Sequence, residues 1–268
     1  MEKIILVTGA SSGIGMAFVN LLHARGDIVY GASRKGDLGG LPGDDRLRGI
    51  VMDVTNTSSV EAAVSEVVAR HGRIDALIHC AGMGVSGPLE NTDDRLLDLQ
   101  FNTNVMGMMR VSRAVLPVMR ENMNGRIILF GSVAGRISIP YQGAYSASKA
   151  AISSLARSMR AEVKPYGIQC SVIEPGDIHT NFTANRVKAE LAVDSPYADA
   201  CERAVSQMEK DETEGTAPEK IAGAVIKHVL DRGRMPVRYV PGAGYRSLCL
   251  LQRILPDRLV EFVVSKMY

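Results

Sequence analysis

Cysteine is scarce in this chain, with four residues among 268, and tryptophan is absent. No two cysteines lie within four residues of each other, so the sequence contains neither a CxxC redox pair nor a zinc cluster, and we expect no metal site. A disulfide-stabilised secreted chain of this length would carry more cysteine, which makes a reduced, cytoplasmic setting the simpler interpretation. The four residues are Cys80, Cys170, Cys201 and Cys249.

Long apolar runs and an excess of charge of one sign are also missing. The chain has no apolar run of about 18 residues, the length of a membrane-spanning helix, and the run 4–7 is too short for a signal peptide. Lys and Arg number 31 against 29 Asp and Glu, and this net charge of +2 is too small to indicate a nucleic-acid partner. Hydrophobic residues at 46% and charged residues at 22% are typical of a globular protein, here expected to be a single domain over 1–268.

Short apolar runs alternate with longer stretches of helical periodicity along most of the chain. This alternation predicts an α/β fold: a Rossmann-like, doubly wound parallel sheet of about seven strands with helices on both faces. The stretch 93–119 forms either one long helix or two abutting ones, and Pro117 either kinks it or lies in its last turns. The expected strands are 4–7, 28–32, 49–52, 76–79, 126–130, 168–173 and 235–240. The other expected helices are 14–24, 58–70, 143–163 and 218–230.

Two stretches lie outside this alternation. Residues 180–216 are polar, and we expect helical excursions without a strand, inserted as a lid over the substrate. The tail 245–268 carries apolar residues at helical spacing with arginines off that stripe. Such a helical tail packs on its own domain or a sister subunit, or it lies on a membrane surface.

The first segment that indicates chemistry is Thr8–Gly15, TGASSGIG, directly after the first expected strand. Its glycines Gly9, Gly13 and Gly15 permit positive-φ backbone and close approach of a ligand. Because the segment opens a helix, its free N–H groups and the helix dipole favour a pyrophosphate. We interpret it as a nucleotide-binding loop rather than a plain tight turn.

A second segment combines a phenol, an ammonium and a hydroxyl. Tyr145 and Lys149 are four residues apart, so they share one face of a helix. A nearby ammonium lowers the pKa of a phenol, which makes the pair a candidate general acid and base. Ser132 follows a parallel strand at the end where such sheets bind ligands, 13 residues before Tyr145.

These motifs occur in the same order as in the short-chain dehydrogenase/reductase superfamily. Residues 3–180 therefore resemble this superfamily, in its single-domain branch. The pattern also includes an Ala-Gly pair at 81–82, an Asn in a long helix and a Pro-Gly pair at 175–176. The resemblance implies an NAD(P)-dependent oxidoreductase that interconverts a secondary alcohol and a ketone. It therefore implies catalysis rather than binding alone.

The family roles fall on four residues of this chain. Tyr145 matches the residue that exchanges a proton with the substrate, and Ser132 matches the one that hydrogen-bonds the substrate oxygen. Lys149 matches the lysine that holds the nicotinamide ribose and lowers the tyrosine pKa. Asn104 matches the helix Asn that holds a water in a proton relay, and its spacing to the following glycine favours it over Asn102.

The resemblance also implies where the cofactor binds. Asp53 matches the acid that hydrogen-bonds the adenine amine, and Val54 beside it would pack on the ring. The segment 175–180 matches the family's PGxxxT, which contacts the nicotinamide carboxamide and the phosphates. The implied cofactor-binding residues are Gly9, Ser11, Ser12, Gly13, Ile14, Gly15, Ser33, Arg34, Asp53, Val54, Ala81, Gly82, Tyr145, Lys149, Pro175, Gly176, Ile178 and Thr180.

The end of the second expected strand indicates which cofactor is used. An NAD enzyme usually places a carboxylate there for the ribose 2′-hydroxyl, and positions 30–36 hold none. Ser33 can donate to a 2′-phosphate and Arg34 can bind it through two nitrogens. We therefore expect NADP(H) rather than NAD(H).

The chain departs from the family pattern at one place, where NNAG is replaced by HCAG at 79–82. The family Asn at position 80 stabilises the central sheet, so its loss is expected to cost some local rigidity. His79 at a strand end is interpreted as structural, and Cys80 as a small buried hydrophobe. Neither is assigned a catalytic role.

The variable segments indicate a small hydrophobic alcohol or ketone as substrate. The stretches 82–90 and 131–135 resemble those of 17β-hydroxysteroid and retinol dehydrogenases, which implies a steroid or retinoid. A catalytically weak nucleotide-binding regulatory protein and a peripheral membrane-associated lipid carbonyl reductase are the alternatives. Related proteins pair their two long helices, here 93–119 and 143–163, in a homodimer or homotetramer. The residues expected to line the pocket are Met83, Val85, Ile139, Pro140, Tyr141, Phe182 and Met208.

Overall fold

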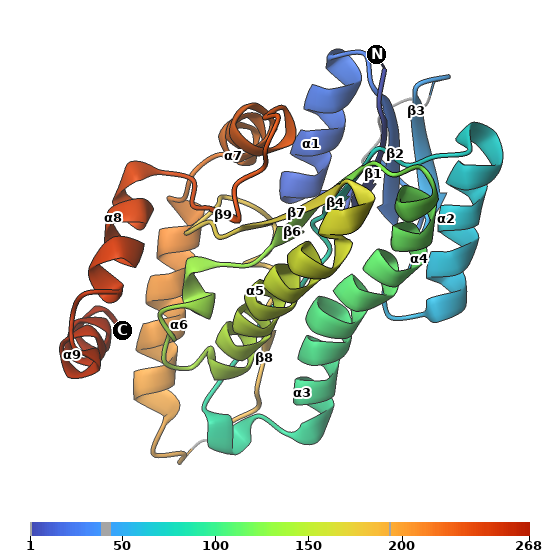
Figure 1. Ribbon diagram of the computed structural model, residues 1–268. Helices are drawn as coiled ribbons and strands as arrows, with labels where there is room; N and C mark the ends of the chain where they lie inside the picture. The colour runs from blue at the N-terminus through green and yellow to red at the C-terminus, as the bar shows by residue number, and fades with distance from the viewer. Residues whose placement is uncertain (1, 39–43, 193) are drawn as a thin grey trace.

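A parallel seven-stranded sheet forms the centre of the molecule in the computed structural model, which describes residues 2–38, 44–192 and 194–268 (Figure 1). The strand order is β3-β2-β1-β4-β6-β7-β9, so the predicted α/β, doubly wound fold is confirmed. The strands are β1 (Ile4–Thr8), β2 (Ile28–Ser33), β3 (Leu47–Val51), β4 (Ala76–His79), β6 (Gly125–Phe130), β7 (Ile168–Ile173) and β9 (Arg238–Tyr239).

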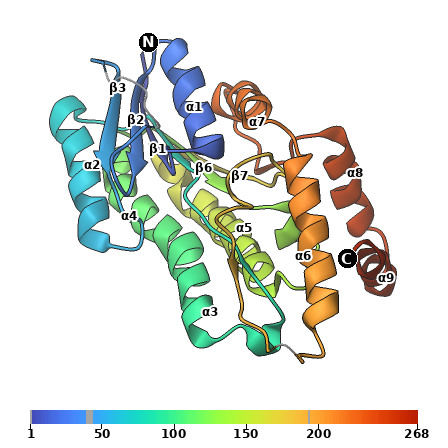
Figure 2. The ribbon, with the colours of Figure 1, turned by 180° about the vertical axis from the view of Figure 1, so that it is seen from behind.

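Helices cover both faces of the sheet, which is why its central strands are mostly apolar. On one face lie α1 (Gly13–Ala24) and α7 (Pro218–Val225), which bury Phe18 and Val225 against β1 and β4. On the other lie α2 (Thr57–His71), α4 (Gly107–Glu121) and α5 (Gly143–Val163), which surround Met108 and Met159. Figure 2 shows the same three layers from behind.

The stretch 93–119 is a single helical run with a π-helical insertion. It consists of α3 (Asp94–Phe101), a π segment over Asn102–Met106, and α4. Pro117 lies within the last turns of α4. A π turn widens the helix by one residue, and such insertions are common at functional sites.

The prediction that residues 180–216 contain no strand is wrong. A two-residue strand, β8 (Val187–Lys188), pairs in parallel with β5 (Val85–Ser86) outside the central sheet. Two residues are too few to produce an alternation of polar and apolar side chains, so the sequence carried no strand signal. The helix α6 (Ala198–Thr213) follows.

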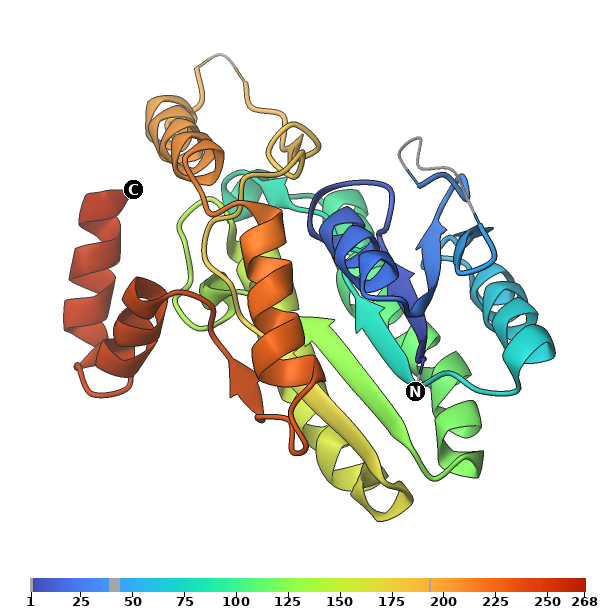
Figure 3. The same ribbon diagram turned by 90° about the horizontal axis from the view of Figure 1, so that it is seen from above.

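The chain ends in two helices, α8 (Ala243–Gln252) and α9 (Asp257–Met267). Figure 3 shows them side by side at the edge of the molecule, away from the central strands. Cys249 of α8 is buried with Val133 and Ile137, which attaches the tail to the domain. None of the helices in the described ranges has the length and apolar character needed to cross a bilayer.

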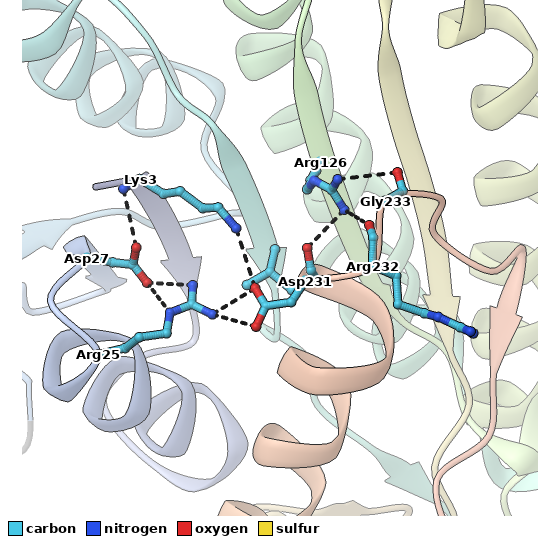
Figure 4. A network of polar contacts seen from close by, with 8 residues as sticks. Lys3, Arg25, Asp27, Arg126, Asp231, Arg232 and Gly233 are labelled. Carbon is cyan, nitrogen blue, oxygen red and sulfur yellow. Dashed lines mark hydrogen bonds and ion pairs between the residues drawn. The ribbon is translucent and has the colours of Figure 1, made fainter. Parts of the chain in front are cut away.

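A polar network joins the amino ends of the strands, opposite the end where ligands bind in such sheets (Figure 4). Arg25 binds the buried Asp27 at 2.5 Å and Asp231 at 2.9 Å, and Lys3 reaches Asp231 at 3.4 Å. Arg126 of β6 donates to the carbonyls of Leu230, Arg232 and Gly233. These contacts fix the chain after α7 to the start of the sheet without involving the carboxyl edge.

Candidate active site

A cavity of about 1310 Å³ opens at the carboxyl edge of the sheet, where the strand order reverses between β1 and β4. It extends from the end of β2 to the tail helices. Most residues assigned from the sequence line it: Gly9, Ser11, Ser12, Gly13, Ile14, Ser33, Arg34, Asp53, Val54, Ala81, Gly82, Ser132, Tyr145, Lys149, Pro175, Gly176, Ile178 and Thr180. Two do not, Asn104 and Gly15.

The glycine loop approaches two neighbouring segments so closely that side chains would not fit. Gly9 has φ +67°, and a Cβ there would lie 2.9 Å from the Ala81 nitrogen. A Cβ at Gly13 would lie 3.2 Å from the Thr180 side chain, and one at Gly15 only 2.2 Å from the Gly9 oxygen. Gly15 therefore serves the packing of α1 on its own loop. The loop and the N-terminus of α1 together line the cavity, and a helix N-terminus with its free N–H groups fits a pyrophosphate.

The adenosine end of the cavity contains one exposed arginine and one fixed carboxylate. Asp53 accepts from the Thr55 hydroxyl at 2.7 Å and the Thr55 N–H at 2.9 Å, and these bonds lower the pKa of Asp53, with a smaller contribution from Arg34. The Ser33 hydroxyl donates to the Asp37 carbonyl at 3.1 Å. Its hydrogen is therefore engaged within the loop, which leaves Arg34 as the donor toward a 2′-phosphate.

Tyr145 and Ser132 meet in the middle of the cavity. Burial raises the pKa of Tyr145 to about 12, and the Ser132 hydroxyl is the group that lowers it most. Lys149 lies 5.6 Å from the Tyr145 ring centroid, and its ammonium donates to the Phe130 carbonyl at 2.9 Å. Burial lowers the pKa of Lys149 to about 8. The pKa of Tyr145 is therefore not lowered as expected from Lys149: burial raises it, Ser132 offsets only part of the rise, and Tyr145 is protonated at neutral pH.

Asn104 lies in the π segment, behind the cavity wall rather than in it. Its side chain accepts from the Met83 N–H at 2.9 Å and donates to the Met83 carbonyl at 3.0 Å and the Ser148 hydroxyl at 3.1 Å. Gln100, which the sequence analysis missed, accepts from the Val85 N–H at 2.7 Å in the same way. The two amides fix the strand-end backbone beside Gly82 to α5. No local pattern marks Gln100, because its partner is distant in the sequence.

His79 and Cys80 have the unreactive character expected of them. His79 is buried and shares a 3.0 Å hydrogen bond between its Nδ1 and the Thr8 hydroxyl. Burial lowers the pKa of His79 to about 3 and raises that of the Cys80 thiol, so both are neutral at physiological pH. Cys80 is half-buried rather than fully buried, and it lines the cavity.

Exchange of His79 for asparagine is expected to reduce the acid sensitivity of the fold. The unfolded chain protonates this histidine near 6.5 and the folded chain only near 3, so the unfolded state binds one more proton between these values. The free energy of unfolding therefore falls as the pH drops below 6.5. Between about pH 7 and 5 the native protein should lose about 2 kcal/mol more than His79→Asn, measured by urea unfolding. An equal loss in both proteins would contradict the role of His79.

The opposite wall comes from residues 180–216. Phe182 contacts the Tyr145 ring with centroids 5.5 Å apart, and the Arg186 guanidinium lies 5.7 Å from the Phe182 ring. Arg186 is buried and pairs with Glu212 of α6. Met83, Ile139, Phe182 and Met208 line the cavity as expected, whereas Val85, Pro140 and Tyr141 do not. Val85 belongs to the buried β5, which explains its absence from the wall.

A further residue, Tyr245 of α8, was not found from the sequence. A Cβ added to Gly176 would lie 2.0 Å from its ring, and its hydroxyl donates to the Asp177 carboxylate at 2.6 Å. The tail therefore contacts the Pro-Gly segment directly. Nothing in the sequence near Tyr245 indicates this contact, which spans 68 residues.

A sequence model described as short chain dehydrogenase matches residues 3–191, which include the glycine loop, Ser132, Tyr145, Lys149 and the Pro-Gly segment but not α6 or the tail. The chain belongs to the short-chain dehydrogenase family. It is similar to a protein of Bacteroides thetaiotaomicron named 3-ketodihydrosphingosine reductase, 38% identical over 99% of this chain and 98% of that protein. Dehydrogenase/reductase SDR family member 7B of Danio rerio is 31% identical over 99% of this chain and 85% of that protein.

Solved short-chain dehydrogenases share the fold. One from Streptomyces avermitilis superposes with a TM-score of 0.84 at 31% identity, covering 99% of this chain and 96% of that one. One from Burkholderia cenocepacia, solved in complex with NADP, gives a TM-score of 0.77 at 25% identity and covers 98% of each chain. The protein is accordingly an NAD(P)-dependent dehydrogenase or reductase, and its glycine loop, helix N-terminus and long cavity fit a dinucleotide.

Proposed function

We propose that this short-chain dehydrogenase uses NADPH to reduce the ketone of a long-chain, mostly apolar substrate, for which 3-ketodihydrosphingosine represents the class. The observation that carries the proposal is the shape of the cavity: Tyr145 and Ser132 share it with apolar side chains of α8 and α9. The Bacteroides relative is named for the reduction of this amino ketone. A long chain would lie along the tail helices while its ketone meets Tyr145.

The chain's own residues supply the proton and hold the carbonyl. Bound NADPH supplies the hydride for the carbonyl carbon. Tyr145 donates its phenolic proton to the carbonyl oxygen, and a pKa of about 12 means that the proton is in place at neutral pH. Ser132 donates a hydrogen bond to the same oxygen as it gains negative charge. Lys149 holds the nicotinamide ribose, and Asn104 positions the backbone beside it.

Carboxylates in the same cavity support an amine-bearing substrate. Asp177, Asp211 and Glu214 line it near the junction with the tail. An amino ketone carries an ammonium next to the carbonyl, and a carboxylate within a few ångströms would stabilise that charge. Steroids and retinoids, which the sequence resemblance implies, lack such a cation. The ammonium of an amino ketone could therefore pair with a carboxylate of the cavity wall, which a steroid or retinoid could not do.

NADP(H) is the proposed cofactor because Arg34 is the cation at the adenosine end of the cavity. Its exposed side chain can reach a 2′-phosphate, and Lys35 beside it adds positive charge. Residues 30–36 provide no carboxylate for the 2′-hydroxyl of NAD(H).

A substrate panel tests the proposed function. The purified protein is incubated with NADPH or NADH and with 3-ketodihydrosphingosine, steroid ketones, retinal or simple ketones, and nicotinamide absorbance is followed. We expect the highest kcat/KM for the long-chain amino ketone with NADPH. A preference for steroid or retinoid carbonyls would overturn the substrate class. Cofactor binding without turnover of any substrate would support a regulatory protein instead.

We also propose that residues 1–268 act as one NAD(P)-binding domain with 180–216 as the substrate lid. Phe182 and Met208 of this stretch line the cavity opposite the sheet, as a lid requires. We also propose a cytoplasmic location. The four cysteines support this location, because all are free thiols and three of them are buried.

Assembly into a homodimer or homotetramer is expected through α3, α4 and α5. Five apolar residues of these helices pack inside the chain and are therefore not available to an interface: Leu96, Val105, Met108, Ala156 and Met159. Met106 remains exposed on the same helical run and is the better candidate, whereas the exposed Leu99 lines the cavity. Light scattering at micromolar concentration should give at least twice the 28.9 kDa chain mass, and Met106→Asp should shift it toward the monomer. A monomer at that concentration would contradict the expectation.

A further inference from the structure

The tail helices leave an apolar surface uncovered. Large apolar side chains with more than a third of their surface exposed are concentrated here among the described residues. Leu248, Leu251, Val263 and Met267 line the active-site cavity, whereas Leu250, Ile254, Leu259 and Phe262 lie outside it. Ile254 is 71% exposed and Phe262 58% exposed. Within the described part of the chain, α9 buries no residue fully. Exposed apolar surface on this scale marks a binding surface rather than ordinary exposure.

The inner sides of the two helices are already in use. Leu251, Leu255 and Val264 line the cavity that holds Tyr145, and Cys249 packs into the domain. The side of the tail that remains lies outward, on the edge visible in Figures 1 and 3. The helix pair α8 and α9, here called the hairpin, therefore has the active-site cavity on one side and solvent on the other.

Basic residues share this outer side with the apolar ones. On α8 and just beyond it, Arg246, Leu250 and Ile254 are spaced by four residues, and Arg253 lies three after Leu250. On α9, Arg258, Phe262 and Lys266 have the same spacing, and the Lys266 ammonium lies 5.9 Å from the Phe262 ring. Helical periodicity places each set on one stripe. We name these exposed residues, with Leu259, the outer tail face: Arg246, Leu250, Arg253, Ile254, Arg258, Leu259, Phe262 and Lys266.

The tail's acidic residues are outnumbered by its cations. Asp257 and Glu261 are the two carboxylates of residues 243–268, and Glu261 lies beside Arg258, three residues before it on the same helix. The outer tail face thus combines four apolar side chains with four cations. A second copy of the same face would bring four more cations against these, whereas an anionic lipid surface would neutralise them.

We propose that the outer tail face docks the enzyme on an anionic lipid bilayer. The apolar side chains enter the interface between headgroups and acyl chains, and the arginines and lysine pair with lipid phosphates. The hairpin then separates the bilayer from the cavity by the thickness of one helix layer. A long-chain ketone would pass from the membrane along Leu251 and Leu255 toward Tyr145. This entry path rests on the proposed function, whereas the docking surface does not.

Vesicle flotation tests the docking surface. The full-length protein is mixed with vesicles of equal parts phosphatidylglycerol and phosphatidylcholine, or with phosphatidylcholine alone. We expect flotation with the anionic vesicles, and a decrease of roughly tenfold in the double variant Ile254→Asp, Phe262→Asp. The matched control is Met123→Asp, Val237→Asp, which changes two exposed apolar residues outside residues 243–268 and should float like the native protein.

The salt dependence of flotation and the oligomeric mass of each variant distinguish the possible outcomes. Flotation should weaken at about 0.5 M KCl, because the cations contribute to binding. Absence of native flotation, or equal flotation of the tail variant, would overturn the proposal. A tail variant that dissociates a native oligomer while no form floats would assign the face to a second copy and likewise overturn it. Reduction of a short, water-soluble ketone by the native protein is measured in parallel. Absence of this activity would count against the proposed function, not against docking.

Discussion

Turnover in the Tyr145→Phe variant is expected to fall by about two to four powers of ten, the usual contribution of a general acid. The substitution keeps the ring and its contact with Phe182, so the cavity wall should retain its shape. Affinity for NADPH should change little, because the phenolic oxygen faces the substrate carbonyl in the proposed reaction. The measurement is single-turnover oxidation of NADPH with a saturating ketone, together with cofactor titration.

Tyr166→Phe serves as the matched control. Tyr166 is 40% exposed and lies in the turn after α5, so the loss of its hydroxyl should leave kcat unchanged. Near-normal turnover in Tyr145→Phe would show that Tyr145 is not the general acid. A similar fall in both variants would point to damage to the fold.

Arg34→Ala is expected to raise the Michaelis constant for NADPH by about 10- to 150-fold and leave that for NADH nearly unchanged. A charge-assisted hydrogen bond contributes roughly 1.5–3 kcal/mol, which corresponds to this range. The effect falls on NADPH because only the 2′-phosphate carries charge close to Arg34. Ser33→Asp should go further, since its carboxylate would repel the phosphate and accept from the 2′-hydroxyl of NADH.

Arg120→Ala is the control for a general change in surface charge. Arg120 is exposed near the C-terminal end of α4 and does not line the cavity. Both Michaelis constants should stay unchanged in it. Preference of the native enzyme for NADH, or an equal effect of Arg34→Ala on both cofactors, would show that Arg34 is only a loop residue.

Elements with a long periodic pattern could be predicted from the sequence, and short or irregular ones could not. Buried strands such as β1 are apolar over most of their length, and helices such as α5 repeat their apolar residues over several turns. The strand β8 has two residues and therefore no period. The π segment at 102–106 differs from an α-helix only in its hydrogen bonds, which side-chain periodicity does not record.

In the candidate site, too, some features could be predicted from the sequence and others could not. Tyr145 and Lys149 are four residues apart, so their shared helix face follows from the sequence. Their ionisation does not, because it depends on burial, which raises the pKa of Tyr145 to about 12 and lowers that of Lys149 to about 8. Tyr245 and Gln100 could not be found, since their partners are distant in the chain and their contacts exist only once the sheet has assembled.

The π turn at Asn102–Met106 also makes this part of the chain intolerant of a change in length. Deletion of one residue would restore a regular α-helix, but it would rotate α3 by about 100° relative to α4. Gln100 lies in α3 and Asn104 within the π turn, and both now bind the same carbonyl, that of Met83. A shortened helix could satisfy only one of them. Library designs that sample insertions and deletions should therefore leave this turn intact and place length variation in surface loops.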